Sequence, residues 1–67
     1  MKNWNDVPDG YTVERIGGAD CAVYRYEDGT YFAKVLNRPG CMTKANTRVE
    51  LEAMIASAIA EWDEVAK

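Results

Sequence analysis

The C-terminal part of the chain has the hydrophobic spacing of an amphipathic helix. Residues 48–66 contain no Gly or Pro and are rich in Ala, Glu, Met and Leu, which favour helix. Thr47 and Glu50 have the spacing of a capping box, in which the Thr47 hydroxyl accepts the Glu50 amide and the Glu50 carboxylate bonds back to the Thr47 amide. The apolar stripe at helical spacing consists of Leu51, Met54, Ile55, Ala58, Ile59, Trp62, Val65 and Ala66. We expect a helix over residues 47–66.

Three β-rich segments precede this helix, at residues 11–16, 21–26 and 31–36. Gly17-Gly18 ends the first segment, and Asp28-Gly29 lies between the second and the third. Asp-Gly in this position favours a two-residue type I′ hairpin turn, whose central residues both need positive φ. We expect a three-stranded antiparallel meander over residues 11–36, after a polar lead-in at residues 1–9.

The two-residue turn also predicts the register of the hairpin. Tyr24 then faces Ala33, and side chains alternate between the two faces of the sheet. The expected core face carries Ala22, Tyr24, Tyr26, Tyr31, Ala33 and Val35. The opposite, partly exposed face carries Cys21, Val23, Arg25, Phe32, Lys34 and Leu36.

Residues 37–40 are expected to be a loop, because Pro39 and Gly40 do not continue a strand. The predicted fold class is α+β: a three-stranded antiparallel sheet with one C-terminal amphipathic helix packed on one face, in the order β-β-β-α. Residues 1–67 are expected to form a single domain.

Composition narrows the function classes. The net charge is −3, histidine is absent, and the two cysteines, Cys21 and Cys41, are twenty residues apart. The commonest general base and metal ligand is therefore missing, and two cysteines alone do not complete a zinc site. No apolar run approaches the ~20 residues that span a bilayer. We expect a cytoplasmic, non-enzymatic protein with reduced thiols, no cofactor, no metal and no membrane association.

Several short motifs follow one another in a recognisable order. They are Gly29-Thr30-Tyr31-Phe32, Pro39-Gly40-Cys41 with Thr43, Thr47 with Glu50, and Ala58-Ile59. Their order over residues 23–62 resembles HicB-like antitoxin domains, although Ala45-Asn46 stands where that family has Gly-Asp. The resemblance implies inhibition by occlusion of a small basic toxin, an RNase with a double-stranded-RNA-binding-like fold. The family's C-terminal DNA-binding region has no counterpart in this sequence, so autorepression is not expected.

Two sets of residues are candidate binding residues, and each has a plainer interpretation. The partner-binding set is Glu50, Glu52, Glu61, Asp63 and Glu64 on the helix, with Arg25, Phe32 and Lys34 on the sheet. The self-association set is Val49, Ala53, Ala56 and Ala60. An acidic helix face is also an ordinary solvated surface, alanine is also the best helix former, and a thin domain also exposes an aromatic ring.

Three functions are consistent with these features. The first is a HicB antitoxin-like inhibitor that blocks a basic, nucleic-acid-binding protein, with a homodimer as one oligomeric alternative. The second is an inhibitor encoded by a phage or mobile element, of the anti-CRISPR kind. The third is an integrase-type DNA-binding domain. Because Lys and Arg are scattered along an acidic chain, direct nucleic-acid binding is not expected.

Overall fold

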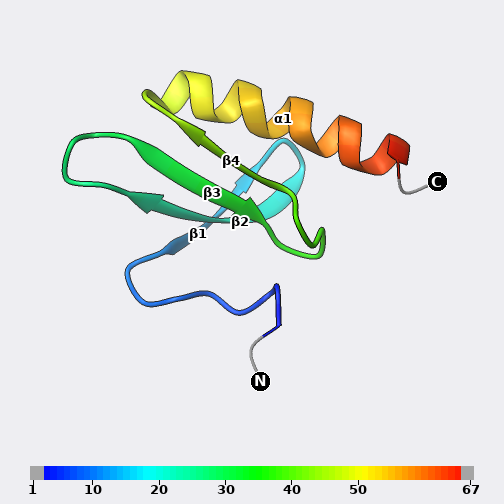
Figure 1. The fold of residues 1–67 in the computed structure, drawn as a ribbon, viewed down its shortest axis with the longest axis horizontal. Helices are drawn as coiled ribbons and strands as arrows, with labels where there is room; N and C mark the ends of the chain where they lie inside the picture. The colour runs from blue at the N-terminus through cyan, green and yellow to red at the C-terminus, as the bar shows by residue number, and fades with distance from the viewer. Residues whose placement is uncertain (1–2, 66–67) are drawn as a thin grey trace.

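The protein is a four-stranded sheet with one helix on it, and the computed structural model describes residues 3–65. The elements are β1 (Thr12–Ile16), β2 (Ala19–Arg25), β3 (Tyr31–Val35), β4 (Met42–Ala45) and α1 (Arg48–Val65) (Figure 1). The strands lie in the order β1-β2-β3-β4, and each neighbouring pair is antiparallel. The α+β class with a C-terminal helix is confirmed, but the prediction of three strands is wrong.

The fourth strand follows the Pro-Gly segment that the sequence analysis took for the end of the sheet. The Val35 amide donates to the Cys41 carbonyl at 2.8 Å, and the Cys41 amide donates to the Arg38 carbonyl at 2.9 Å. Asn37 and Gly40 adopt the left-handed conformation, with φ of 67° and 87°. These bonds close a hairpin turn, so the chain reverses and returns beside β3 as β4. Pro39 lies in the turn, where its missing N–H costs no ladder bond.

The β2–β3 turn has three residues, not the two expected. The Tyr26 amide donates to the Thr30 carbonyl at 2.8 Å, and Gly29 has a φ of 92°. Asp28 is not among the residues with positive φ, so a type I′ turn is excluded. Its carboxylate instead accepts the Thr30 amide at 3.0 Å and the Thr30 hydroxyl at 2.7 Å. These bonds hold the turn as an Asx-type loop that ends in a left-handed glycine.

The extra turn residue shifts the register by one and exchanges the faces of β2. Val23 lies opposite Ala33, and Tyr24 lies opposite Phe32. The face toward α1, here called the covered face, therefore carries Cys21 and Val23 with Ala33 and Val35, whereas Ala22 and Tyr24 lie on the other, open face. The predicted core face was wrong for β2 and right for Ala33 and Val35. Arg25, opposite Tyr31, does not share a face with Phe32 and Lys34.

The core lies between the covered face and α1. The helix buries Leu51, Ile55 and Ile59 there. Against them pack the buried residues Ile16, Ala19, Cys21, Val23, Ala33, Val35, Cys41 and Ala45. The predicted apolar stripe is wider than the buried one: Ala58 and Trp62 are partly buried, whereas Met54 and Val65 are exposed. Ala66 lies outside the described residues.

The helix begins as its cap predicts. The Glu50 amide donates to the Thr47 hydroxyl at 3.1 Å. Among residues 3–65 the second capping-box bond, from the Thr47 amide to the Glu50 carboxylate, is not formed. The bond that is formed gives the Glu50 N–H, which has no acceptor within the helix, a partner in the Thr47 hydroxyl.

The N-terminal segment lies on the side of the sheet away from α1 (Figure 1). The Trp4 indole donates to the Val35 carbonyl at 2.6 Å. The Lys34 ammonium lies 5.2 Å from the centre of the Trp4 ring and donates to the Asp6 carbonyl at 2.7 Å. This segment therefore covers the end of the open face at the C-terminal end of β3.

Candidate binding surfaces

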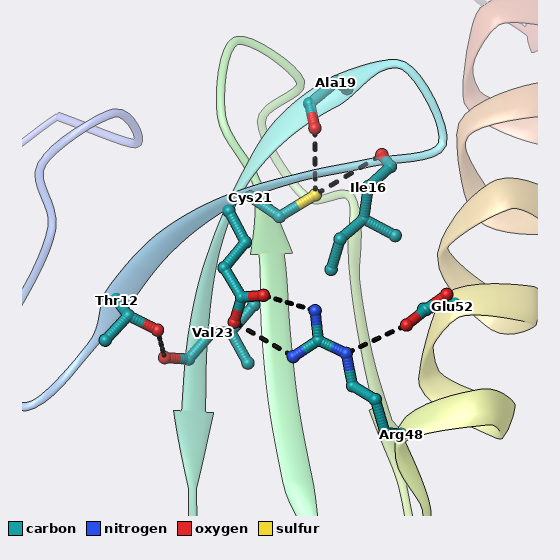
Figure 2. Close-up of polar contacts among 8 residues, drawn as sticks. Thr12, Ile16, Ala19, Cys21, Val23, Arg48 and Glu52 are labelled. Atoms are coloured by element: carbon teal, nitrogen blue, oxygen red, sulfur yellow. Dashed lines mark hydrogen bonds and ion pairs between the residues drawn. The ribbon is translucent and has the colours of Figure 1, made fainter.

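Arg48, at the start of α1, connects the helix to strand β1 through hydrogen bonds (Figure 2). The Arg48 guanidinium donates to both carboxylate oxygens of Glu14 in β1, and its Nε donates to Glu52 at 3.1 Å. The bonds from Arg48 hold the pKa of Glu14 below its ordinary value, and the bond to Glu14 raises the pKa of Arg48. Glu14 and Arg48 are 34 residues apart in sequence, and no local pattern connects them. Glu52, a predicted partner-binding residue, is thus engaged inside the molecule.

The two cysteines are structural parts of the core. Both thiols are free and buried, and the Cys21 sulfur lies 3.6 Å from the Ala19 carbonyl and 4.0 Å from the Ile16 carbonyl (Figure 2). Burial raises the pKa of both thiols, which lowers their thiolate content at neutral pH. Within residues 3–65, no three Cys, Asp or Glu side chains are grouped so that they could hold a metal ion.

The five acidic residues predicted on the helix divide into two sets. Glu52 pairs with Arg48, and Asp63 pairs with Arg38 at 2.9 Å, which raises the pKa of Arg38. The remaining three, Glu50, Glu61 and Glu64, are exposed and make no ion pair with another described residue. Of the five, Glu50, Glu61 and Glu64 therefore have carboxylates that are available to pair with a cation of a binding partner.

A groove of about 310 Å³ separates the C-terminal half of α1 from the start of β4, and we call it the helix–β4 groove. Its lining is Gly40, Cys41, Met42, Ala58, Glu61, Trp62 and Val65. Met42 is 54% exposed and Val65 is 85% exposed. Trp62 is held in place, because its indole donates to the Pro39 carbonyl at 3.2 Å and the Arg38 guanidinium lies 5.9 Å from its ring.

The acidic and the apolar residues meet at this groove. Glu61 belongs to its lining, and helical spacing places Glu50 and the exposed Met54 on the same flank of α1. The result is a largely apolar groove with the Glu61 carboxylate in its lining, whereas Glu50 lies at the other end of the helix. The sequence analysis identified Glu61, but it placed Met54 and Val65 in the apolar stripe of the helix and assigned Met42 to no element.

The predicted self-association stripe lies on another side of α1. Val49 is 80% exposed, and Ala53, Ala56 and Ala60 are exposed. Gly17, in the β1–β2 turn, comes close to Ala56: a Cβ built on Gly17 would lie 3.5 Å from the Ala56 Cα. Part of this stripe is therefore already in contact with the β1–β2 turn.

The open face of the sheet carries four contacting aromatic rings, which we call the aromatic patch: Tyr11, Tyr24, Tyr26 and Phe32. The ring centres of Tyr11 and Tyr24 are 5.2 Å apart, and those of Tyr24 and Tyr26 are 5.0 Å apart. Burial, together with the neighbouring tyrosines, raises the pKa of Tyr11. The sequence analysis placed Phe32 on an exposed face but assigned Tyr24 and Tyr26 to the core. The signal that could have corrected it is the Asp28-Gly29-Thr30 sequence of the turn.

No family model matches the chain, and neither a curated protein nor a solved structure is significantly similar to it. Within the part of the chain that the structure describes, no helix is both long and apolar enough to cross a bilayer.

Proposed function

We propose that this protein is a non-catalytic inhibitor that binds a basic, nucleic-acid-processing protein, such as a small RNase toxin, and covers its active surface. The contact is made by the helix–β4 groove. The observation that carries the proposal is that the exposed Val65 and the ring of Trp62 lie in one groove with Glu61, whose carboxylate forms no ion pair with another described residue.

The groove has the chemistry that such a contact needs. Val65 provides exposed apolar area to bury, and Trp62 provides a rigid aromatic wall. Apolar anchors surrounded by a polar rim are the usual composition of a protein interface. The free carboxylate of Glu61 favours a partner that carries Lys or Arg opposite it.

The motif order adds a second, independent support. The Pro39-Gly40-Cys41 segment and the capping Thr47, which resemble HicB-like antitoxin domains, lie at the two ends of β4. Gly40 and Cys41 line the groove themselves. Three of the residues that carry the resemblance, Gly40, Cys41 and Ala58, therefore line the candidate site.

A pair of charge reversals on the same helix tests the proposal. The tagged protein is used to recover its partner from the native host, and the nuclease activity of that partner is measured with and without the protein. Glu61→Lys should weaken binding about tenfold or more, because it places a cation on the groove rim opposite a basic partner. Glu64→Lys is the matched control, because Glu64 is also exposed and unpaired but lies on the side of α1 opposite Ile55.

The expected result is loss of inhibition with Glu61→Lys and retention with Glu64→Lys. Equal effects of the two reversals would show that only the overall charge matters. Recovery of an acidic partner, or a recovered nuclease that stays fully active, would also refute the proposal.

A further inference from the structure

The open face of the sheet brings aromatic rings and a lysine together. Tyr11, Tyr24, Phe32 and Lys44 form one row across it, since Tyr24 lies opposite Phe32, and Phe32 lies opposite Lys44. The Tyr11 and Phe32 ring centres are 6.3 Å apart, and the planes are perpendicular. The Lys44 ammonium lies 5.3 Å from the centre of the Tyr26 ring. Rings and a cation are therefore contiguous here.

The patch is accessible from solvent. Tyr26 is 40% exposed, Lys44 is exposed, and the other three rings are half-buried. The N-terminal segment covers the opposite end of this face, where Trp4 reaches Val35. Gly10 passes beside Tyr24, where an added Cβ would lie 3.2 Å from the ring, and so the chain runs along the edge of the patch.

Among residues 3–65, the cations without an ion pair lie in the sheet. Of the six Lys and Arg among residues 3–65, Arg15, Arg38 and Arg48 are paired with carboxylates. The other three, Arg25, Lys34 and Lys44, lie in β2, β3 and β4, and the two lysines are on the open face. The free carboxylates of α1 lie on the other side of the sheet. The two unpaired lysines thus lie on the face away from the acidic helix, whereas Arg25 lies on the covered face.

Asp28, in the β2–β3 turn, is an anion whose pKa Lys44 affects. Its pKa is lowered mainly by the Thr30 amide and hydroxyl, and to a smaller extent by Lys44. Thr30 donates both bonds to Oδ1 of Asp28, and Asp28 forms no ion pair with Lys44. The Lys44 ammonium keeps its charge available for a ligand.

We propose that the aromatic patch binds a short segment of single-stranded nucleic acid, with bases against the exposed rings and a phosphate at Lys44. A ligand for this surface must be flat, apolar on its faces and anionic, and a nucleotide has all three properties. Single strands expose their base faces, whereas a duplex hides them, and stacking on aromatic side chains is the usual basis of sequence-tolerant single-strand binding. This proposal concerns the face away from the helix–β4 groove and does not depend on the proposed function.

Fluorescence anisotropy tests this proposal directly. The probes are fluorescein-labelled oligothymidylate and oligouridylate of about eight nucleotides, which separate DNA from RNA preference. Tyr26→Ala should weaken binding about fivefold or more, which is the loss expected for one stacked base. Lys44→Glu should weaken it about tenfold. For the one phosphate at Lys44, binding should fall about threefold between about 50 and 200 mM salt.

Arg25→Glu is the matched control for Lys44→Glu. Arg25 is an exposed, unpaired cation of the same sheet, but it lies on the opposite face, beside Tyr31. The proposal predicts little change with this variant, and circular dichroism melting confirms that all variants are folded. Equal loss with Arg25→Glu would show general charge attraction and would overturn it. So would duplex binding as tight as single-strand binding, no binding at all, or self-association that Tyr26→Ala abolishes.

Discussion

The two faces of the sheet are built from the same strands but are opposite in character. The covered face has small and aliphatic side chains, such as Ala19, Val23 and Ala33, all less than a tenth exposed. The open face has rings and lysines, with Val13 and Met42 each 54% exposed. The covered face is shaped for close contact with a helix, whereas the open face presents groups that are useful to a ligand. Side chains alternate between the two faces along each strand, so each strand supplies residues to both faces. The register set by the β2–β3 turn decides which residues lie on which face.

The largest expected effect is on the helix contact of the covered face. Ile55 is completely buried, so Ile55→Ala removes its packing and leaves a cavity that costs about 2–5 kcal/mol of the free energy of unfolding. In a domain of this size, such a loss is a large part of the total stability. Urea denaturation measures it. Met54→Ala, at the neighbouring exposed position, should cost less than about 1 kcal/mol. If the two variants had equal stability, α1 would not pack through Ile55.

An identical truncation on each face sharpens the comparison. Val23 is 4% exposed on the covered face, and Val13 is 54% exposed on the open face. Val23→Ala should cost about 2 kcal/mol, and Val13→Ala about 0.5 kcal/mol, because only the first removes apolar area from the core. Both positions are in strands, so the loss of β-propensity affects both variants. Thermal unfolding of the pair measures the difference, and a reversed order would mean that β1 and β2 present their other faces to the helix.

A smaller effect concerns the ion pair at the rim of the covered face. Glu14→Gln should cost about 1 kcal/mol at pH 7, since the contact with Arg48 is charge-assisted but partly open to solvent. The folded-state pKa of Glu14 lies below its unfolded value, so its contribution is present above about pH 4.3 and is lost as the pH falls through the folded value.

Denaturation of the wild type and of Glu14→Gln at a series of pH values checks this window. The difference between their free energies of unfolding should shrink as the pH is lowered below about 4. A difference that stays constant from neutral to acid pH would mean that Arg48 interacts with the glutamate side chain in some other way.

The elements that depend on local signals were predictable from the sequence. Three local signals place α1, β1, β2 and β3 within a residue or two: the helix cap at Thr47, the absence of Gly and Pro after it, and the breaks at Gly17-Gly18 and Asp28-Gly29. Asp-Gly alone did not predict the register. The Asp28 carboxylate accepts the amide and the hydroxyl of Thr30, and Asp28 does not adopt the positive φ that a type I′ turn requires. Strand β4 was missed because Pro39-Gly40 ends one strand and also turns the chain into the next.

The candidate surfaces were only partly predictable, and for the same reasons. Glu61 follows from helical spacing, but the groove beside it requires β4. Tyr24 and Tyr26 reach the open face only in the shifted register. Arg48, a cation of the helix, donates to Glu14, which is 34 residues away in the sequence. Long-range contacts thus decide which charges are free.

The register of β2 on β3 is the central claim, because it decides which side chains form the open face. The Tyr26–Thr30 and Leu36–Asp20 backbone bonds make Val23 and Ala33 a non-hydrogen-bonded pair, in which the two Hα atoms lie close together. A nuclear Overhauser spectrum measures this directly. The account predicts strong Hα–Hα cross-peaks between Val23 and Ala33 and between Cys21 and Val35. Cross-peaks that pair Tyr24 with Ala33 instead would contradict it.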